Sequence, residues 1–185
     1  MANLILTSKI VNDEYTDYVY KSYDIQDKEL SITQIKNNID LNEMQDWNIG
    51  VICGGSGSGK TSILKTFGSI SDCDFDSKKP LISCFDFLSP EDACQLLTNV
   101  GLASVPSWLR PYSTLSNGEQ YRAKLAYIIG KAKDDEVILI DEYTSVVDRD
   151  VAKSMSFALQ KYVRRKGKRI ILASCHFDIM DWLQP

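Results

Sequence analysis

The segment at residues 54–61 has the composition and spacing of a loop that holds phosphate groups. It reads Gly-Gly-Ser-Gly-Ser-Gly-Lys-Thr and matches the pattern G-x-x-x-x-G-K-[ST] in full. The glycines let backbone N–H groups turn toward phosphate oxygens, and a following helix adds the positive end of its dipole. We predict that Lys60 reaches the β- and γ-phosphates of a nucleotide and that the Thr61 hydroxyl holds Mg²⁺. The predicted nucleotide-binding residues of this phosphate loop are Gly54, Gly55, Ser56, Gly57, Ser58, Gly59, Lys60, Thr61 and Ser62.

Two acids follow an apolar run further along the chain. Residues 137–140 read Val-Ile-Leu-Ile and are followed by Asp141 and Glu142. Alone, this pattern is typical of a strand that leaves the core, but the upstream phosphate loop gives it weight. Asp141 is then placed to hold the hydration shell of Mg²⁺, and Glu142 to orient or deprotonate an attacking water. We therefore predict Asp141 as a metal ligand, and Glu142 with Lys60 as catalytic residues.

The segment at residues 115–120, Leu-Ser-Asn-Gly-Glu-Gln, resembles the signature motif of ATP-binding cassette (ABC) ATPases, Leu-Ser-Gly-Gly-Gln or Leu-Ser-Gly-Gly-Glu. Asn117 replaces the first glycine, and asparagine tolerates positive φ better than most residues. By itself the segment is an ordinary helix capping box of Ser116 and Glu119. The resemblance implies that Ser116, Asn117 and Gly118 contact the γ-phosphate of ATP held by another subunit, in a head-to-tail homodimer that forms on ATP binding.

Further motifs agree with this resemblance, which spans residues 47–176. Residues 145–148 look like the family's D-loop, and His176 stands after an apolar run where ABC proteins keep a switch histidine for the γ-phosphate. The resemblance implies Mg²⁺-dependent hydrolysis of ATP, with His176 as a further catalytic residue. Residues 100–102, 108–112, 115–120, 141–149 and 181–185 resemble the ABC-type ATPases found fused to a predicted acetyltransferase domain. No region of acetyltransferase size is present, so that activity is not expected.

The sequence departs from the family at three places. The helical arm is reduced to residues 87–115, mainly one helix. Asp86 stands where the family usually places a glutamine, and we expect it to face Mg²⁺ through water, which leaves the glutamine's role open. For the aromatic residue that stacks on adenine we choose Tyr23, with Tyr20 and Trp47 as alternatives.

The order of expected elements indicates an α/β fold. We expect strands at residues 4–11, 15–23, 47–53, 81–85, 137–140 and 169–173, and helices at 61–67, 89–100, 119–133 and 151–164. Residues 32–39 are expected to form a short helix or a loop, and residues 69–80 a loop. Strands that alternate with helices predict a mainly parallel central sheet, here of the ABC P-loop type with antiparallel N-terminal strands. We expect a single ATPase domain over residues 1–185.

Composition bounds the class of protein. The 185 residues are 44% hydrophobic and 25% charged, with a formal net charge of −4, as in ordinary globular domains. The five cysteines form no C-x-x-C pair, which favours free thiols in the cytoplasm and disfavours a zinc site. No apolar run reaches about 18 residues, so we expect no insertion into a membrane.

The partner is left open between three classes. The short arm and Glu119 favour an ATPase that acts on DNA or RNA. The alternatives are the nucleotide-binding subunit of a transporter and an ATP-gated module that binds an unidentified protein. Residues 162–169 hold five basic side chains in eight positions, which indicates either a nucleic-acid patch or, somewhat better, a helix end that complements the helix dipole.

Overall fold

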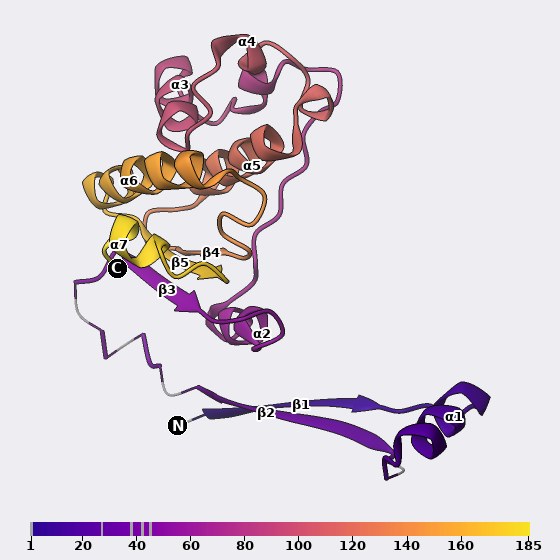
Figure 1. Cartoon of the computed structure of the whole chain (residues 1–185). Helices are drawn as coiled ribbons and strands as arrows, with labels where there is room; N and C mark the ends of the chain where they lie inside the picture. The colour runs from indigo at the N-terminus through magenta and orange to yellow at the C-terminus, as the bar shows by residue number, and fades with distance from the viewer. Residues whose placement is uncertain (1, 27, 38, 42, 45) are drawn as a thin grey trace. The chain divides into compact units, whose positions relative to one another are not determined.

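A computed structural model describes residues 2–26, 28–37, 39–41, 43–44 and 46–185 of the chain (Figure 1). Contacts between residues divide it into two units, residues 1–44 and residues 45–185, and each is described by itself. The single ATPase domain stays a prediction. Among the described residues, no helix combines the length and the apolar composition that crossing a membrane requires.

The first unit is a pair of antiparallel strands with a helix between them. Strands β1 (Ala2–Lys9) and β2 (Leu30–Asn37) pair with Ile5 opposite Gln34, and helix α1 (Glu14–Tyr23) connects them. The predicted antiparallel pairing of N-terminal strands is confirmed, but the strand expected at 15–23 is wrong, since α1 occupies it and β2 is the second strand of the pair. A capping box explains the helix, because the Asp13 carboxylate accepts the Thr16 N–H and the Thr16 hydroxyl accepts the Asp13 N–H. The helix or loop expected at 32–39 is wrong as well, since β2 occupies most of it.

A three-stranded parallel sheet forms the centre of the second unit. Its strands β3 (Ile49–Cys53), β4 (Val137–Ile140) and β5 (Arg169–Ser174) follow the order β3-β5-β4. Residue Ile52 pairs with Ala173, and Ile140 pairs with Leu172. Because parallel strands end at the same edge, the segments that follow all three strands meet there. The sheet is therefore the element that gathers the predicted site.

Helices cover this sheet and continue the chain from its edge. They are α2 (Lys60–Leu64), which a 3₁₀ turn at Lys65–Phe67 extends, α5 (Asn117–Lys131), α6 (Arg149–Arg165) and α7 (Ile179–Leu183). Figure 1 shows α2 at the end of β3, and α3 and α4 on the far side of α5 from the strands. Leu125, Ile129, Ile138 and Leu172 are all buried in the core between α5 and the strands. The α/β class with a mainly parallel sheet is confirmed.

The arm, residues 87–115, contains α3 (Pro90–Asn99), the short α4 (Val105–Trp108) and the 3₁₀ turn η3 (Tyr112–Thr114), and a further 3₁₀ turn, η2 (Leu81–Cys84), precedes it. Ser89 caps α3 by accepting the Asp92 N–H, so the helix lies within the range expected for it, residues 89–100. The strand expected at 81–85 is wrong, because η2 occupies it. Leu81 and Phe85 are apolar because they are buried in the core, not because they face a sheet. No helix or strand interrupts residues 69–80, in agreement with the expected loop.

Candidate functional site

The phosphate loop leaves the end of β3 and turns directly into α2. The Gly54 N–H donates to the Ser174 carbonyl at 3.3 Å, which ties the start of the loop to the end of β5. Gly57 and Gly59 have φ of 75° and 86°, left-handed values that a residue with a Cβ adopts only at a cost. The Lys60 ammonium folds back over the loop and donates to the Gly55 carbonyl at 2.7 Å. The loop therefore holds a cation over its own backbone, as a phosphate-binding cradle needs.

Thr61 and Asp141 meet although they are far apart in the sequence. The Thr61 hydroxyl donates to Asp141 Oδ2 at 2.7 Å, and Asp141 Oδ1 accepts the Glu142 N–H at 2.9 Å. A hydroxyl and a carboxylate are hard oxygen ligands of the kind that Mg²⁺ takes beside phosphates. The residues present thus fit the predicted cation, at the mouth of the phosphate loop.

The acidic turn, residues 141–144 after β4, has an unusual backbone. Glu142 and Thr144 have φ of 51° and 66°. Such values are sparsely populated for residues with a Cβ, especially for a β-branched threonine, and cost on the order of 1–3 kcal/mol each. Between them the Tyr143 N–H donates to the Ala173 carbonyl at 2.8 Å, and the Tyr143 ring is buried. The surrounding fold therefore holds Glu142 in a direction that an extended strand would not give it.

The histidine segment, residues 174–178 after β5, is bonded to the other two segments. The buried Ser174 hydroxyl donates to the Tyr143 carbonyl at 2.8 Å and accepts the His176 N–H at 3.1 Å. The Cys53 thiol donates to the His176 carbonyl at 3.6 Å, and burial raises the pKa of that thiol. The structure thus brings together the phosphate loop, the acidic turn and the histidine segment, which all follow strands of the same parallel sheet.

The signature segment, residues 115–120, begins helix α5. Ser116 and Glu119 form the capping box: the Glu119 carboxylate accepts the Ser116 N–H at 2.9 Å, and the Ser116 hydroxyl accepts the Glu119 N–H at 3.4 Å. Asn117 is the first helical residue, so the positive φ considered for it is not used. A Cβ added to Gly118 would lie 3.4 Å from the Val146 carbonyl, so the segment packs against residues 145–148 of its own chain.

Ser107 of α4 completes the surroundings of Glu119. Its hydroxyl donates to Glu119 Oε1 at 2.6 Å. Hydrogen bonds from Ser107 and then from Ser116 lower the pKa of Glu119 to about 2. The arm is therefore anchored on the start of α5 by a charged acceptor.

The remaining predicted residues are Tyr23, with its alternatives Tyr20 and Trp47, and Asp86. Tyr23 is the last residue of α1 and is exposed, and the Tyr20 hydroxyl donates to the Lys28 carbonyl within the same unit. The Trp47 ring lies under the Arg169 guanidinium at 5.8 Å. Asp86 follows η2, directly before the arm, and is exposed, and none of its described contacts joins it to Thr61 or Asp141. The adenine-stacking and metal roles of these residues stay predictions.

The cations of the basic run each have a partner within the chain. They bond to backbone carbonyls, to an amide side chain and to carboxylates around the end of α6. The pairs are Arg164 with Gln184, Arg165 with Gln95, Lys166 with Asp92, Lys168 with Ala132 and Asp134, and Arg169 with Asp135. These contacts favour the helix-end interpretation of the run.

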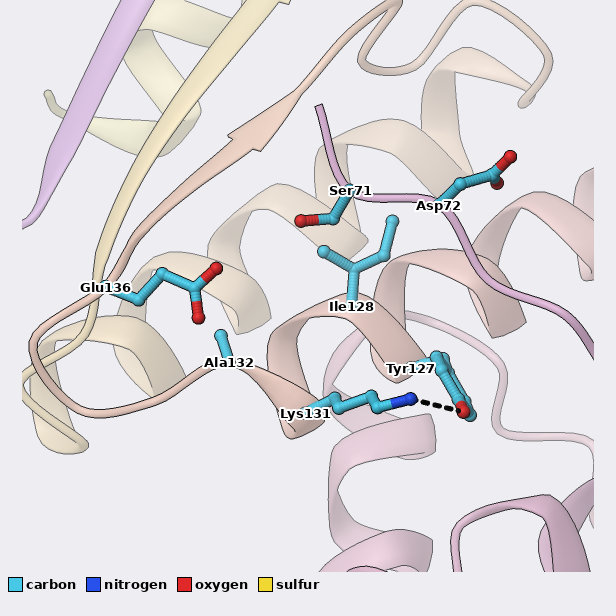
Figure 2. Close-up of a pocket in the computed structure, with 7 residues that line it drawn as sticks. All are labelled: Ser71, Asp72, Tyr127, Ile128, Lys131, Ala132 and Glu136. Atoms are coloured by element: carbon cyan, nitrogen blue, oxygen red, sulfur yellow. Dashed lines mark hydrogen bonds between the residues drawn. The ribbon is translucent and has the colours of Figure 1, made fainter. Parts of the chain in front are cut away.

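A hollow of about 280 Å³ lies at the other end of α5 (Figure 2). Its lining consists of Ser71, Asp72, Tyr127, Ile128, Lys131, Ala132 and Glu136. At its rim Lys131 donates to the hydroxyl of Tyr127, one turn earlier on α5, at 3.2 Å. Because no residue of the phosphate loop lines this hollow, we do not include it in the candidate site.

The sequence motifs do not single out Ser174 or Arg149, the first residue of α6, although both contact the site. Arg149 bonds to Thr144 and to Asp178, in the acidic turn and in the histidine segment. Their importance comes from contacts between segments that are distant along the chain. A serine two residues before the predicted switch histidine, and an arginine directly after the predicted D-loop, are the only local signals.

Comparison with solved structures identifies the fold of this chain. No family model and no curated protein matches the chain. The solved dimeric post-hydrolysis state of the ATP-binding cassette MJ0796, bound to ADP and Pi, superposes with a TM-score of 0.59 at 17% identity over 80% of this chain and 83% of that one. A second dimeric structure of MJ0796, a bacterial ABC transporter cassette, gives 0.58 at 16% identity over 82% and 84%. CbiO1 from Clostridium perfringens, part of the ABC transporter complex cbiONQ, gives 0.51 at 18% over 71% and 68%.

These superpositions confirm that the chain has the fold of ABC ATP-binding cassettes. At such low identity they show the fold alone. The resemblance to the branch fused to an acetyltransferase domain stays a prediction.

Proposed function

We propose that this chain binds ATP with Mg²⁺ and hydrolyses it to ADP and phosphate, as a head-to-tail homodimer. The observation that carries the proposal is the 2.7 Å contact between the Thr61 hydroxyl and the Asp141 carboxylate. It joins the phosphate loop to the acidic turn at the shared edge of the parallel sheet. The cassette fold supports the proposal, because the ATP-binding cassette MJ0796, which has the same fold, is bound to ADP and Pi in its solved structure.

Each residue then has a distinct task. The N–H groups of the phosphate loop and Lys60 bind the β- and γ-phosphates, and Lys60 exchanges its present acceptor, the Gly55 carbonyl, for phosphate oxygens. Thr61 and Asp141 would hold Mg²⁺, which when bound would neutralise charge on those oxygens. Glu142, beside Asp141, orients a water and accepts its proton. His176 donates a hydrogen bond to the γ-phosphate.

The second subunit supplies the remaining contacts. Ser116, Asn117 and Gly118 lie at the N-terminus of the 15-residue helix α5, where orphan N–H groups and the helix dipole favour an anion. We assign them to the γ-phosphate of the nucleotide in the partner subunit. The dimeric state of MJ0796 with ADP and Pi supports this arrangement.

Hydrolysis is tested with Glu142→Gln and Lys60→Ala. Glu142→Gln should bind ATP with parent affinity yet lose about 100-fold or more in kcat, because a general base contributes roughly 10²–10⁴-fold. Lys60→Ala should weaken ATP binding itself. A fluorescent ATP analogue measures affinity, and phosphate release measures turnover. Glu136→Gln, the same change at the opposite end of β4, is the matched control. Parent turnover in Glu142→Gln contradicts the assignment of the base.

Coupling of ATP hydrolysis to DNA or RNA is a further prediction. The basic run does not favour it, because each of its cations has a partner within the chain. Titration of single- and double-stranded DNA at low salt, with ATP held by Glu142→Gln, tests it. Binding that falls steeply with salt and is lost when Arg164, Arg165, Lys166 and Lys168 become Ala would support a nucleic-acid partner. Copurification distinguishes this class from a transporter subunit or a protein-binding module, by whether nucleic acid, a membrane protein or another protein is recovered.

A further inference from the structure

One side chain connects the two segments that flank the site. Arg149 Nη1 donates to Thr144 Oγ1 at 3.2 Å, and its Nε donates to Asp178 Oδ2 at 3.2 Å. Its Nη2 donates to the other carboxylate oxygen of Asp178. The planar guanidinium thus presents a two-pronged fork to Asp178 and a third donor to Thr144. Thr144 lies two residues after Glu142, and Asp178 two residues after His176.

The Thr144 end of this connection supports a strained residue. Thr144 is 1% exposed with φ of 66°, so its backbone conformation needs support from its neighbours. Two side chains provide it: the Tyr121 hydroxyl accepts the Thr144 N–H at 3.3 Å, and Arg149 binds the Thr144 hydroxyl. Loss of the arginine would leave one of these contacts and would free the turn that aims Glu142.

At Asp178, Arg149 contacts the solvent-exposed side of the histidine segment. The Arg149 Cζ lies 5.0 Å from the centre of the Trp182 ring, so α7 packs against the same guanidinium. Ser174 bonds the acidic turn to the histidine segment nearer the sheet, through the Tyr143 carbonyl and the His176 N–H. Removal of Arg149 therefore leaves the strand register in place and loosens only the outer contacts.

The solvent exposure of the Arg149–Asp178 ion pair indicates whether it contributes mainly to folding stability or to the positions of the reacting groups. The side chains of Arg149 and Asp178 are 38% and 46% exposed. Ion pairs this accessible contribute little to folding free energy, because water and salt screen them. A misplacement of about 1 Å at a reacting group, in contrast, can cost about 100-fold in rate. The expected consequence is a change in turnover with little change in stability.

We infer that Arg149 is a positioning residue, which fixes the acidic turn with Glu142 and the histidine segment with His176 in one mutual arrangement. This inference rests on the proposed ATPase function. Arg149 does not touch the nucleotide in this scheme and acts through Thr144 and Asp178. A lysine cannot replace it, because one ammonium lacks the fork that reaches both partners.

The kinetic test uses Arg149→Ala, Arg149→Lys and Asp178→Asn. Each should lower kcat by about 10-fold or more while KM for ATP and nucleotide affinity stay within about 2-fold of the parent. The exchange Arg149→Asp with Asp178→Arg should recover part of kcat, which a loss of folding would not allow. Arg165→Ala is the matched control, because it removes an arginine that bonds to Gln95 at the other end of the same helix.

A second readout does not depend on hydrolysis. His176 is the only histidine of the chain, so the C–H signals of its imidazole ring can be assigned by NMR without overlap from another histidine. Without nucleotide at fixed pH, those signals should shift or broaden in Arg149→Ala and Asp178→Asn and stay unchanged in Arg165→Ala. If the parent protein does not hydrolyse ATP, the proposed function fails, while an imidazole shift still supports the connection. The inference is overturned if the parent hydrolyses ATP and both Arg149→Ala and Asp178→Asn keep the parent kcat. It is also overturned if the imidazole signals are unchanged in both variants.

Discussion

At the scale of single residues, the hydrogen-bond donors around Glu119 strongly lower the pKa of its carboxylate. Three donors converge on it: the Ser107 hydroxyl, the Ser116 N–H and the Ser116 hydroxyl. They hold its pKa at about 2, below the ordinary value of 4.5. A carboxylate with a lowered pKa stabilises the fold above its ordinary pKa, and this contribution is lost as pH falls toward the folded-state pKa.

The lowered pKa also predicts how the stability of the Glu119→Gln variant, compared with the parent, depends on pH. At pH 6 the variant should be less stable than the parent by about 1 kcal/mol, the usual scale of a helix cap. The difference should shrink as pH falls from 4.5 toward 2, because the unfolded parent takes up a proton at Glu119 before the folded carboxylate does. Urea unfolding at each pH measures this, with Glu43→Gln, an exposed glutamate in the other unit, as control. A difference that grows as pH falls would show that the charge does not stabilise the cap.

At the scale of secondary-structure elements, the sequence predicts those that carry complete local signals. Residues 137–140 form a strand with the predicted bounds, and the helix after Ser89 begins where serine and proline place it. The errors have physical causes. Tyrosine and valine in α1 suggested a strand, but the Asp13–Thr16 capping box decides for a helix. The mainly apolar run at 81–85, Leu-Ile-Ser-Cys-Phe, satisfies a strand and a buried 3₁₀ turn equally well. The phosphate loop and acidic pair are predictable because motifs define them, whereas Arg149 and Ser174 act through tertiary contacts that no spacing reveals.

Gly130 tests how closely the arm packs on α5. A Cβ there would lie 2.9 Å from Leu96 Cδ2, 3.1 Å from Phe87 Cε2 and 3.2 Å from Leu88 Cδ1. Alanine gains about 1 kcal/mol of helix propensity, but overpacking costs about 1–3 kcal/mol, and three close contacts favour the larger figure. Gly130→Ala should therefore lower the free energy of unfolding by about 1–2 kcal/mol in urea, with ATP affinity retained. Lys161→Ala, on the exposed side of α6, is the control. Equal or greater stability would mean that α3 moves away from α5 at little cost.

At the scale of the whole molecule, the proposed site is divided between two places on one chain. The phosphate loop, the acidic turn and His176 lie at the edge of the sheet, whereas Ser116 begins α5 and serves no phosphate of its own chain in this scheme. Gly118 packs against the Val146 carbonyl, so the signature segment and residues 145–148 form one continuous surface. Two copies placed head to tail would bring this surface onto the partner's phosphate loop twice, and ATP would lie in both contacts.

ATP should therefore control the association of two chains. Glu142→Gln with ATP and Mg²⁺ should sediment as a dimer, because bound ATP persists, and as a monomer or looser species without nucleotide. Adding Ser116→Arg should abolish the dimer, since a bulky cation fills the place of the partner's γ-phosphate, and the same change in the parent should abolish turnover. The isolated subunit should still bind ATP through its intact phosphate loop. Ser154→Arg, on the exposed side of α6, is the matched control and should dimerise normally. A monomer at high protein concentration with saturating ATP, or equal dimerisation of the Ser116→Arg variant, would rule out the shared site.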